Sequence, residues 1–138
     1  MILYVKKMLI YTTKLILQKR SKIKRKMKIK HGSKIINIPN VKKVSKFGEG
    51  IGLMFHRVDR CPAMLFEFNS PTKLKIHSFF VFFKFGAVWL DDKNRIIDKK
   101  IIKPFQLSIS CKKPFYKLIE IPLNKAYKEN IKFIFGKK

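Results

Sequence analysis

Acidic residues are scarce in this sequence and unevenly placed. Among 138 residues, 8 are Asp or Glu and 33 are Lys or Arg, which gives a formal net charge of +25. No carboxylate precedes Glu49. Paired-carboxylate catalysis needs two acids that converge on one cleft, whereas the adjacent Asp91 and Asp92 are expected in a solvated turn. Glu67 and Glu120, each alone in an apolar segment, are expected to face solvent or to pair with Lys.

Cysteine motifs and serine-nucleophile motifs are absent. Cys61 and Cys111 are the only cysteines, and no Cys-x-x-Cys pair is present. His56 and His77 would complete a four-ligand metal set with them, but no local spacing pre-forms that site. Because no secretion signal accompanies the two cysteines, we expect free thiols. No serine lies in a Gly-x-Ser-x-Gly elbow. The sequence predicts no catalytic residue, metal or cofactor, and it favours a non-enzymatic protein.

Long hydrophobic runs are also missing. No apolar stretch approaches the roughly 18 to 20 residues of a membrane-spanning helix. Lys14 interrupts the stretch that would serve as the core of a signal peptide. What is present, 46% hydrophobic residues and 13 Phe, predicts a folded core rather than a disordered chain. We expect a cytoplasmic protein, with peripheral contact to the membrane as an open alternative.

Residues 1–26 are interpreted as a basic, partly apolar N-terminal extension. Three interpretations stay open: a membrane anchor, a disordered basic arm, or a stretch that is not translated because the natural start is Met27. An arm or anchor would contact an anionic surface, either lipid or nucleic acid. Only five of the basic residues are Arg, which argues against specific nucleic-acid recognition. The candidate anion or membrane contacts are Lys19, Arg20, Lys22, Lys24, Arg25 and Lys26.

Residues 27–138 are predicted to form a single β-rich domain. Glycine and polar turns mark two hairpins, and short runs of Phe, Val and Ile mark further strands. The apolar run 76–83 is predicted as the central strand, because a run without alternation implies burial on both faces. The expected fold class is α+β, mainly β: a small curled sheet or a partly closed β-barrel with one short helix. The expected strands are 27–30, 35–38, 63–68, 76–83, 87–90, 95–97, 115–121 and 131–135.

The short helix is expected to begin near Val41, because apolar residues recur there about every third position. Pro39-Asn40 is expected to end the preceding strand, and Gly48 is expected to end or bend the helix. Glycines alternate over the range 48–52, as they would in a phosphate-binding loop. The Gly-Lys-Ser/Thr ending of such loops is missing here. The segment is therefore interpreted as structural.

Several segments from Met27 onward resemble a known family of small prokaryotic proteins. In chain order they are Met27-Lys28-Ile29, Gly52-Leu53-Met54-Phe55, the ranges 63–68, 76–83 and 87–91, Lys103-Pro104-Phe105, and the range 118–122. Over about residues 27–136 the chain thereby resembles the domain of unknown function 192, whose archaeal members typically begin like Met27-Lys28-Ile29. The resemblance implies a compact, mainly β domain and brings no particular reaction or ligand with it.

The chain departs from the pattern of this family at Lys84-Phe85-Gly86, where relatives usually carry Pro, an aliphatic residue and Asp. A role of that Asp in relatives would therefore be lost here, because Gly86 has no side chain.

The leading functional hypothesis is a non-enzymatic binding or accessory module. Its expected ligand pocket is lined by His56, Arg57, His77 and Trp89, because these side chains fall in or beside the family-like segments. One alternative is a basic nucleic-acid or anionic-surface binder that uses the Lys-rich N-terminal region, residues 14–46, and another is a cryptic hydrolase. The sequence leaves the natural partner and the oligomeric state open.

Overall fold

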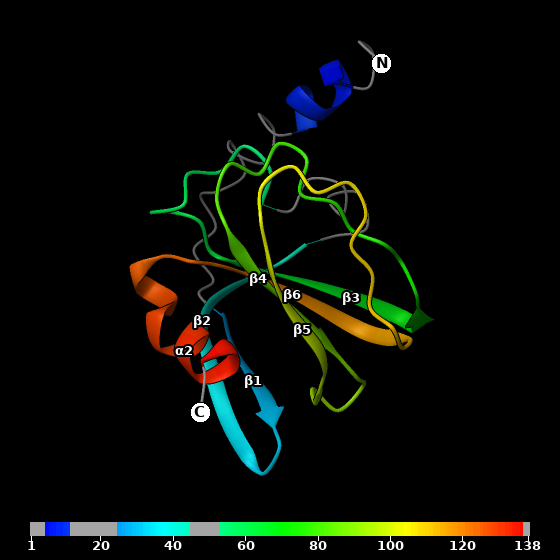
Figure 1. Ribbon diagram of the computed structural model, residues 1–138, viewed down its shortest axis with the longest axis vertical. Coiled ribbons are helices and arrows are strands. Elements are labelled where there is room, and N and C mark those ends of the chain that lie inside the picture. Colours follow the sequence, from blue (N-terminus) through cyan, green and yellow to red (C-terminus); the bar gives the residue numbers. More distant parts are fainter. Residues whose placement is uncertain (1–4, 12–24, 45–52, 137–138) are drawn as a thin grey trace.

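A computed structural model describes residues 5–11, 25–44 and 53–136 of the chain (Figure 1). The described part is mainly β, with six strands in one sheet and short helical segments at both ends of the chain. Residues 5–11 are helical. The other elements are β1 (Arg25–His31), β2 (Lys34–Lys43), β3 (Ala63–Thr72), β4 (Phe85–Leu90), β5 (Ile96–Ile102), β6 (Phe115–Pro122), the 3₁₀-helix η3 (Lys125–Tyr127) and the α-helix α2 (Lys128–Phe135).

The sheet has the strand order β1-β2-β3-β6-β4-β5. Only β2 and β3 are parallel, and the other neighbours are antiparallel. The sheet curls until its first strand approaches the turn between β4 and β5. There Lys30 forms a bridge with Arg95, and the Lys30 N–H donates to the Asn94 carbonyl at 2.8 Å. This contact confirms the curled, partly closed sheet that the sequence predicts.

The inner face of the curled sheet is apolar and is closed by the C-terminal helices. Ile29, Val88 and Ile119 are fully buried there, although they come from three different strands. Tyr127 of η3 is also fully buried. Its hydroxyl accepts a hydrogen bond from the Ala63 N–H at 2.7 Å and donates one to the Asn40 carbonyl at 2.9 Å. Tyr127 therefore ties the C-terminal segment to β2 and β3.

The outer face of the sheet is covered by loops instead of strands. Trp89 and Phe115 are fully buried on this face, with ring centroids 6.4 Å apart. Residues of the loops 53–62, 73–84 and 103–114 pack over them, together with Met8 of the N-terminal helix. Figure 1 shows these loops and that helix gathered at one end of the molecule, away from the β1–β2 hairpin.

Two predicted hairpins are confirmed. The turn at Gly32 joins β1 to β2, and Gly32 has the positive φ of 63° that glycine adopts without cost. The polar turn after Asp91 joins β4 to β5. The Asp91 carboxylate accepts hydrogen bonds from the backbone N–H groups of Lys93 and Arg95 at 2.9 and 2.8 Å. The predicted strands at 63–68 and 115–121 are also present, as β3 and β6.

The prediction that Pro39-Asn40 ends a strand is wrong, because β2 continues through both residues to Lys43. Arg25 pairs with Val41, and Met27 pairs with Ile38, so two residues of β2 lie opposite one residue of β1. Such a bulge accommodates a proline that cannot donate to the ladder. The helix expected from Val41 is absent over the described residues up to position 44, and its remaining part, 45–52, lies outside the described residues.

Two predicted strands are wrong. Within 76–83 only Ile76 forms an isolated bridge, with Ile109, and the rest is loop. The run is apolar because Phe80 and Val81 pack against the outer face, not because the segment is a central strand. The predicted strand 131–135 belongs to α2. Burial of Ile134 against the inner face stabilises the helix there, so tertiary packing overrides the β-propensity of Ile and Phe.

Candidate functional site

One opening of the curled sheet forms a pocket of about 290 Å³ with a basic lining. We call this pocket the basic mouth. Glu67 is the one carboxylate among the described residues that line it. The basic residues that line it are Arg25, Lys26, Lys28, Lys43 and Lys117, and the remaining lining residues are Met27, Val41, Leu65 and Asn94.

Strand alternation explains why charges gather at this opening. Val41, Leu65 and Ile119 are buried in the inner-face core. Two positions further along each strand toward the opening lie Lys43, Glu67 and Lys117, which share the same face because side chains alternate in a strand. The inner face therefore changes from apolar to charged where the sheet meets solvent.

Two interactions position side chains within the basic mouth. Lys43 Nζ lies 2.6 Å from Glu67 Oε2, which confirms the expectation that Glu67 pairs with Lys. Lys117 Nζ donates to Asn94 Oδ1 at 2.6 Å, and Asn94 Nδ2 donates to the Lys28 carbonyl at 3.1 Å. Asn94 thus links β1 to β6 across the opening.

The turn that carries Asn94 is fixed by Asp91, as the sequence predicts. Arg95 Nε donates to Asp91 Oδ2 at 2.6 Å. Burial works to raise the pKa of Asp91, but the hydrogen bonds from Arg95 and Lys93 outweigh it and hold this pKa below its ordinary value. The turn is therefore stabilised by an ionised carboxylate, and it presents Asn94 at a fixed place beside the basic mouth.

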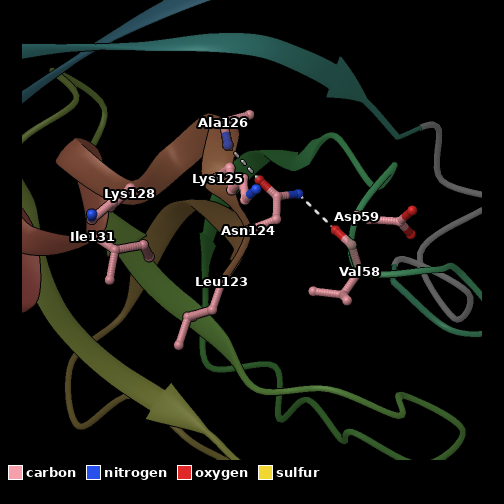
Figure 2. Close-up of a pocket in the computed structure, with 8 residues that line it drawn as sticks. All are labelled: Val58, Asp59, Leu123, Asn124, Lys125, Ala126, Lys128 and Ile131. Atoms are coloured by element: carbon pink, nitrogen blue, oxygen red, sulfur yellow. Dashed lines mark hydrogen bonds between the residues drawn. The ribbon is translucent and has the colours of Figure 1, made fainter.

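A second pocket, of about 630 Å³, lies between the loop at Val58 and the C-terminal helices (Figure 2). The amide of Asn124 spans its wall: Oδ1 accepts from the Ala126 N–H at 3.0 Å, and Nδ2 donates to the carbonyls of Val58 and Cys61 at 2.7 and 3.1 Å. Both N–H groups of that amide thus donate to the backbone and its oxygen accepts one backbone hydrogen bond, so the amide mainly stabilises the wall of the pocket. The other lining residues are Asp59, Leu123, Lys125, Lys128 and Ile131.

The four residues of the sequence-predicted pocket lie in different surroundings. His56 is half-buried, with Nδ1 3.1 Å from the Met54 carbonyl. Arg57 is exposed and pairs with Asp59 at 3.4 Å. His77 is exposed, and its Nδ1 accepts from the Phe79 N–H at 3.3 Å. Trp89 is fully buried, with Lys100 Nζ 5.5 Å from its ring centroid.

None of these four residues is among those that line the two pockets described above, so a shared ligand site for them stays a prediction. Of the predicted anion contacts, Arg25 and Lys26 belong to β1 and line the basic mouth. The other four, Lys19, Arg20, Lys22 and Lys24, lie outside the described residues. Lys28 and Lys43, which also line the basic mouth, lie within the basic region 14–46 but were not among the six predicted contacts, and the contribution of Lys117 was not predicted from the sequence.

The expectation that Glu120 faces solvent or pairs with Lys is wrong. Glu120 is buried on the outer face, where it lies opposite Met64 and Ala87 in the sheet register. Burial raises the pKa of Glu120 to about 8, against the opposing effect of a hydrogen bond from the Leu53 backbone. The carboxyl group is therefore largely protonated at neutral pH, and it holds the segment at Leu53 against the sheet.

Other reactive groups do not converge in the described part of the chain. Cys61 and Cys111 are buried and are not joined in a disulfide, and burial raises the pKa of Cys111. Within the described ranges, no group of three or more His, Cys, Asp or Glu side chains is placed to hold a metal ion. No helix in those ranges is long and apolar enough to cross a membrane.

The fold and the outer-face segments define a small half-barrel domain, and comparison with known proteins identifies its family. Residues 40–133 match the model of the domain of unknown function 192, described as an "Uncharacterized ACR", so the chain belongs to this family. UPF0127 protein PH1112 from Pyrococcus horikoshii is 30% identical over 88 residues, which cover 64% of this chain and 74% of that protein. The resemblance stated from the sequence is confirmed.

Two solved structures share the fold. A protein of unknown function from Novosphingobium aromaticivorans aligns with a TM-score of 0.63 and 13% identity over 77% of each chain. A protein from Sinorhizobium meliloti, described as a "putative transcription regulator", aligns with a TM-score of 0.63 and 17% identity over 78% of this chain and 84% of its own. At these identities the likeness concerns the fold alone.

Gly86, at which the sequence resemblance noted a departure from the family pattern, has a steric role in this chain. A Cβ atom on Gly86 would lie 2.5 Å from Phe135 Cε2 and 2.7 Å from Phe135 Cζ. The ring of Phe135, at the end of α2, therefore occupies the space that an Asp side chain would need. The absence of a side chain at Gly86 thus allows α2 to pack closely against β4.

Proposed function

We propose that the protein is a small non-enzymatic binding module, and that its ligand carries a phosphate-like anion that binds in the basic mouth. The observation that carries the proposal is the lining of this pocket, which among the described residues includes five basic residues and one carboxylate. Because Glu67 is already paired with Lys43, the other basic side chains are left to attract an anion.

The geometry of the basic mouth suits a compact anion. Lys117 is held by Asn94, and the same amide fixes the backbone at Lys28, so part of the site is organised before the ligand arrives. A volume of about 290 Å³ lies just below the usual range for ligand pockets, and it is sufficient for a phosphate or diphosphate group. The longer part of a larger ligand would extend into solvent.

The anion could come from a free polyphosphate or from a nucleic-acid backbone, and both share this chemistry. Lysine acts as a point charge and does not read bases by the forked contacts of arginine. We therefore expect recognition of phosphate without sequence preference. Since Lys43 and the β1 lysines are exposed, binding should weaken steeply with salt.

The test is calorimetric titration of the full chain with inorganic pyrophosphate and with a short oligothymidylate, at low and at physiological salt. Lys117→Gln should lower the affinity for pyrophosphate by about tenfold, because one charge-assisted contact is lost. Lys132→Gln removes an exposed lysine of α2 that does not line the pocket, and it should leave the affinity unchanged.

The two probes distinguish the sources of the anion. Tight binding of pyrophosphate that the oligonucleotide does not displace indicates a small-molecule ligand, whereas much tighter binding of the oligonucleotide indicates nucleic acid. Equal losses in Lys117→Gln and Lys132→Gln would mean that the protein binds anions only through its overall charge, and the proposed site would then be rejected.

The pocket predicted at His56, Arg57, His77 and Trp89 is the weaker candidate for a binding module. Trp89 has no exposed surface, so a ligand would have to open the outer face to reach it. A change of Trp89 fluorescence on addition of a small ligand, together with unaltered binding by Lys117→Gln, would favour this site over the basic mouth.

A further inference from the structure

An exposed patch of phenylalanines lies on the loops that cover the outer face. The patch consists of Phe79, Phe82, Phe105 and Leu107, which are 38, 60, 54 and 74% exposed. The ring centroid of Phe105 lies 6.4 Å from that of Phe79 and 5.7 Å from that of Phe82. The ring of Phe105 thus contacts both of the other rings, and all three remain open to solvent. Clustered apolar exposure of this kind is typical of an interaction surface.

The two loops that carry the phenylalanine patch are locked together at Ser78, which is fully buried. Its hydroxyl donates to the Lys103 carbonyl at 2.6 Å and accepts from the Gln106 N–H at 2.7 Å. The Phe105 N–H donates to the Ser78 carbonyl at 3.0 Å. The loops therefore present the patch from a fixed frame.

The backbone conformation supports the same conclusion. Phe80 and Phe105 have positive φ angles of 63° and 62°, which bulky side chains rarely adopt. The chain thus accepts a locally unfavourable conformation next to the residues that it exposes. Hydrogen bonds at Ser78 compensate for this cost.

The loops around the patch carry positive charge only. Residues 73–84 and 103–113 contain no Asp or Glu. Lys84 follows Phe82 by two positions, and Lys103 precedes Phe105 by two positions, so cations flank the exposed rings in the chain. The other lysines of these two loops are Lys73, Lys75, Lys112 and Lys113.

The N-terminal helix adds apolar surface at the same end of the molecule (Figure 1). Met8 is buried in the outer-face core, which attaches the helix to the domain. Leu9, Ile10 and Tyr11 are 48, 55 and 47% exposed. Helix and loops together thus offer apolar and aromatic side chains in a cationic setting.

We propose that this end of the molecule docks on an anionic lipid bilayer, with the phenylalanine patch in the interface and the loop lysines at the headgroups. Exposed aromatic side chains flanked by Lys match an interface in which apolar burial and attraction to anionic lipid act together. A second copy of the chain is a poorer occupant, because it would bring the same positive charges against this surface. The inference is independent of the anion site, since no residue of the patch lines the basic mouth.

The test is co-sedimentation of the full chain with vesicles of phosphatidylcholine alone and of phosphatidylcholine with one quarter phosphatidylglycerol. The wild-type chain should bind the anionic vesicles and bind the neutral ones much more weakly. The double variant Phe82→Ser/Leu107→Ser should lower binding to the anionic vesicles by about tenfold or more, because two exposed apolar side chains no longer enter the interface.

Ile35→Ser is the matched control, because Ile35 is 61% exposed but lies in the β1–β2 hairpin at the other end of the molecule. It should leave vesicle binding unchanged. The thermal unfolding midpoint of each variant confirms that it folds. The double variant keeps the entire N-terminal segment. A loss of its vesicle binding can therefore be assigned to the loops that carry the phenylalanine patch.

Three results would overturn the proposal. The first is no binding of the wild-type chain to anionic vesicles, and the second is equal binding by the double variant and by Ile35→Ser. The third is a wild-type dimer in sedimentation equilibrium that Phe82→Ser/Leu107→Ser converts to a monomer without an effect on vesicle binding, which would assign the patch to self-association. Pyrophosphate binding should be unaffected in the double variant, so failure here is distinguishable from failure of the anion site.

Discussion

The two faces of the curled sheet are built in different ways. On the inner face, strands close on one another, Tyr127 and α2 complete the core, and charge occurs where the sheet opens at the basic mouth. On the outer face, three loops supply the cover, and they enclose the carboxyl group of Glu120 in an apolar environment.

The difference shows what each face is suited to do. Strand pairing fixes the inner face, so its charged rim is a stable place for a ligand site. Side-chain hydrogen bonds at Ser78 and Asn124 fix the cover of the outer face. Loops held in this way can expose apolar side chains such as Phe82 without loss of the core beneath them.

The largest expected effect concerns the buried acid of the outer face. The folded state keeps the proton of Glu120 up to a pKa of about 8, while the unfolded chain loses it near the ordinary value of 4.5. Between these values the free energy of unfolding should fall as pH rises, with a limiting slope of about 1.4 kcal/mol per pH unit. Glu120→Gln should remove this slope. The free energy of unfolding of the variant should therefore exceed that of the wild type most clearly above pH 8.

Urea unfolding at several pH values between 5 and 9 measures this effect. Glu129→Gln, an exposed acid at the start of α2, is the control and should keep the wild-type slope. If the free energy of unfolding depends on pH in the same way for the wild type and Glu120→Gln, Glu120 is ionised in the folded state. Water would then reach its carboxyl group, in contradiction to the burial seen in the structure.

A smaller loss of stability is expected from the inner face. Tyr127→Phe leaves the Ala63 N–H and the Asn40 carbonyl without their buried partner, which should cost about 1–3 kcal/mol. Tyr116→Phe is the matched control, because the Tyr116 hydroxyl makes no hydrogen bond within the described part of the chain, and it should cost little. Chemical denaturation compares the two variants. Equal losses would contradict the assigned role of Tyr127.

The contact between Gly86 and α2 can be tested by a double-mutant cycle. Gly86→Ala places a methyl group within 3 Å of the Phe135 ring and should destabilise the fold by about 1–2 kcal/mol. In a Phe135→Ala background the same substitution should cost clearly less, because the clash is removed. Additive losses would show that the packing of Phe135 does not explain the glycine.

The smallest effect on stability is expected at the basic mouth. Glu67→Gln removes the carboxylate that pairs with the half-exposed Lys43, and such a pair contributes about 0–1 kcal/mol. The same substitution should strengthen pyrophosphate binding several-fold at low salt, since it removes the negative charge from the lining. Calorimetric titration measures the affinity of this variant for pyrophosphate. Unchanged or weaker binding would mean that the anion does not bind in the basic mouth.

Local patterns in the sequence were sufficient for much of the sheet. Gly32 and the turn after Asp91 mark the two hairpins, because each supplies a residue or side chain that a tight turn requires. The range 76–83 could not be recognised as a loop in this way. Its conformation depends on Ser78, whose hydrogen bonds reach residues more than twenty positions away.

The candidate site was predictable only in part. The density of charge in the sequence singled out Arg25 and Lys26, which line the basic mouth. Lys117 carries no such signal, because its approach to the β1 residues depends on a sheet that curls until Asn94 reaches Lys28. The burial of Glu120 was missed for a similar reason: a lone acid in an apolar strand looks like an exposed one until the covering loop is known.

The most direct test of the basic mouth is a nuclear magnetic resonance titration of the isotopically labelled chain with inorganic pyrophosphate, followed at every backbone amide. The largest shifts are expected at Lys28, Asn94 and Lys117, which three different segments bring to one opening of the sheet. Small shifts spread over lysines of the whole chain, without a maximum at these three residues, would contradict the central claim that this opening is a built anion site.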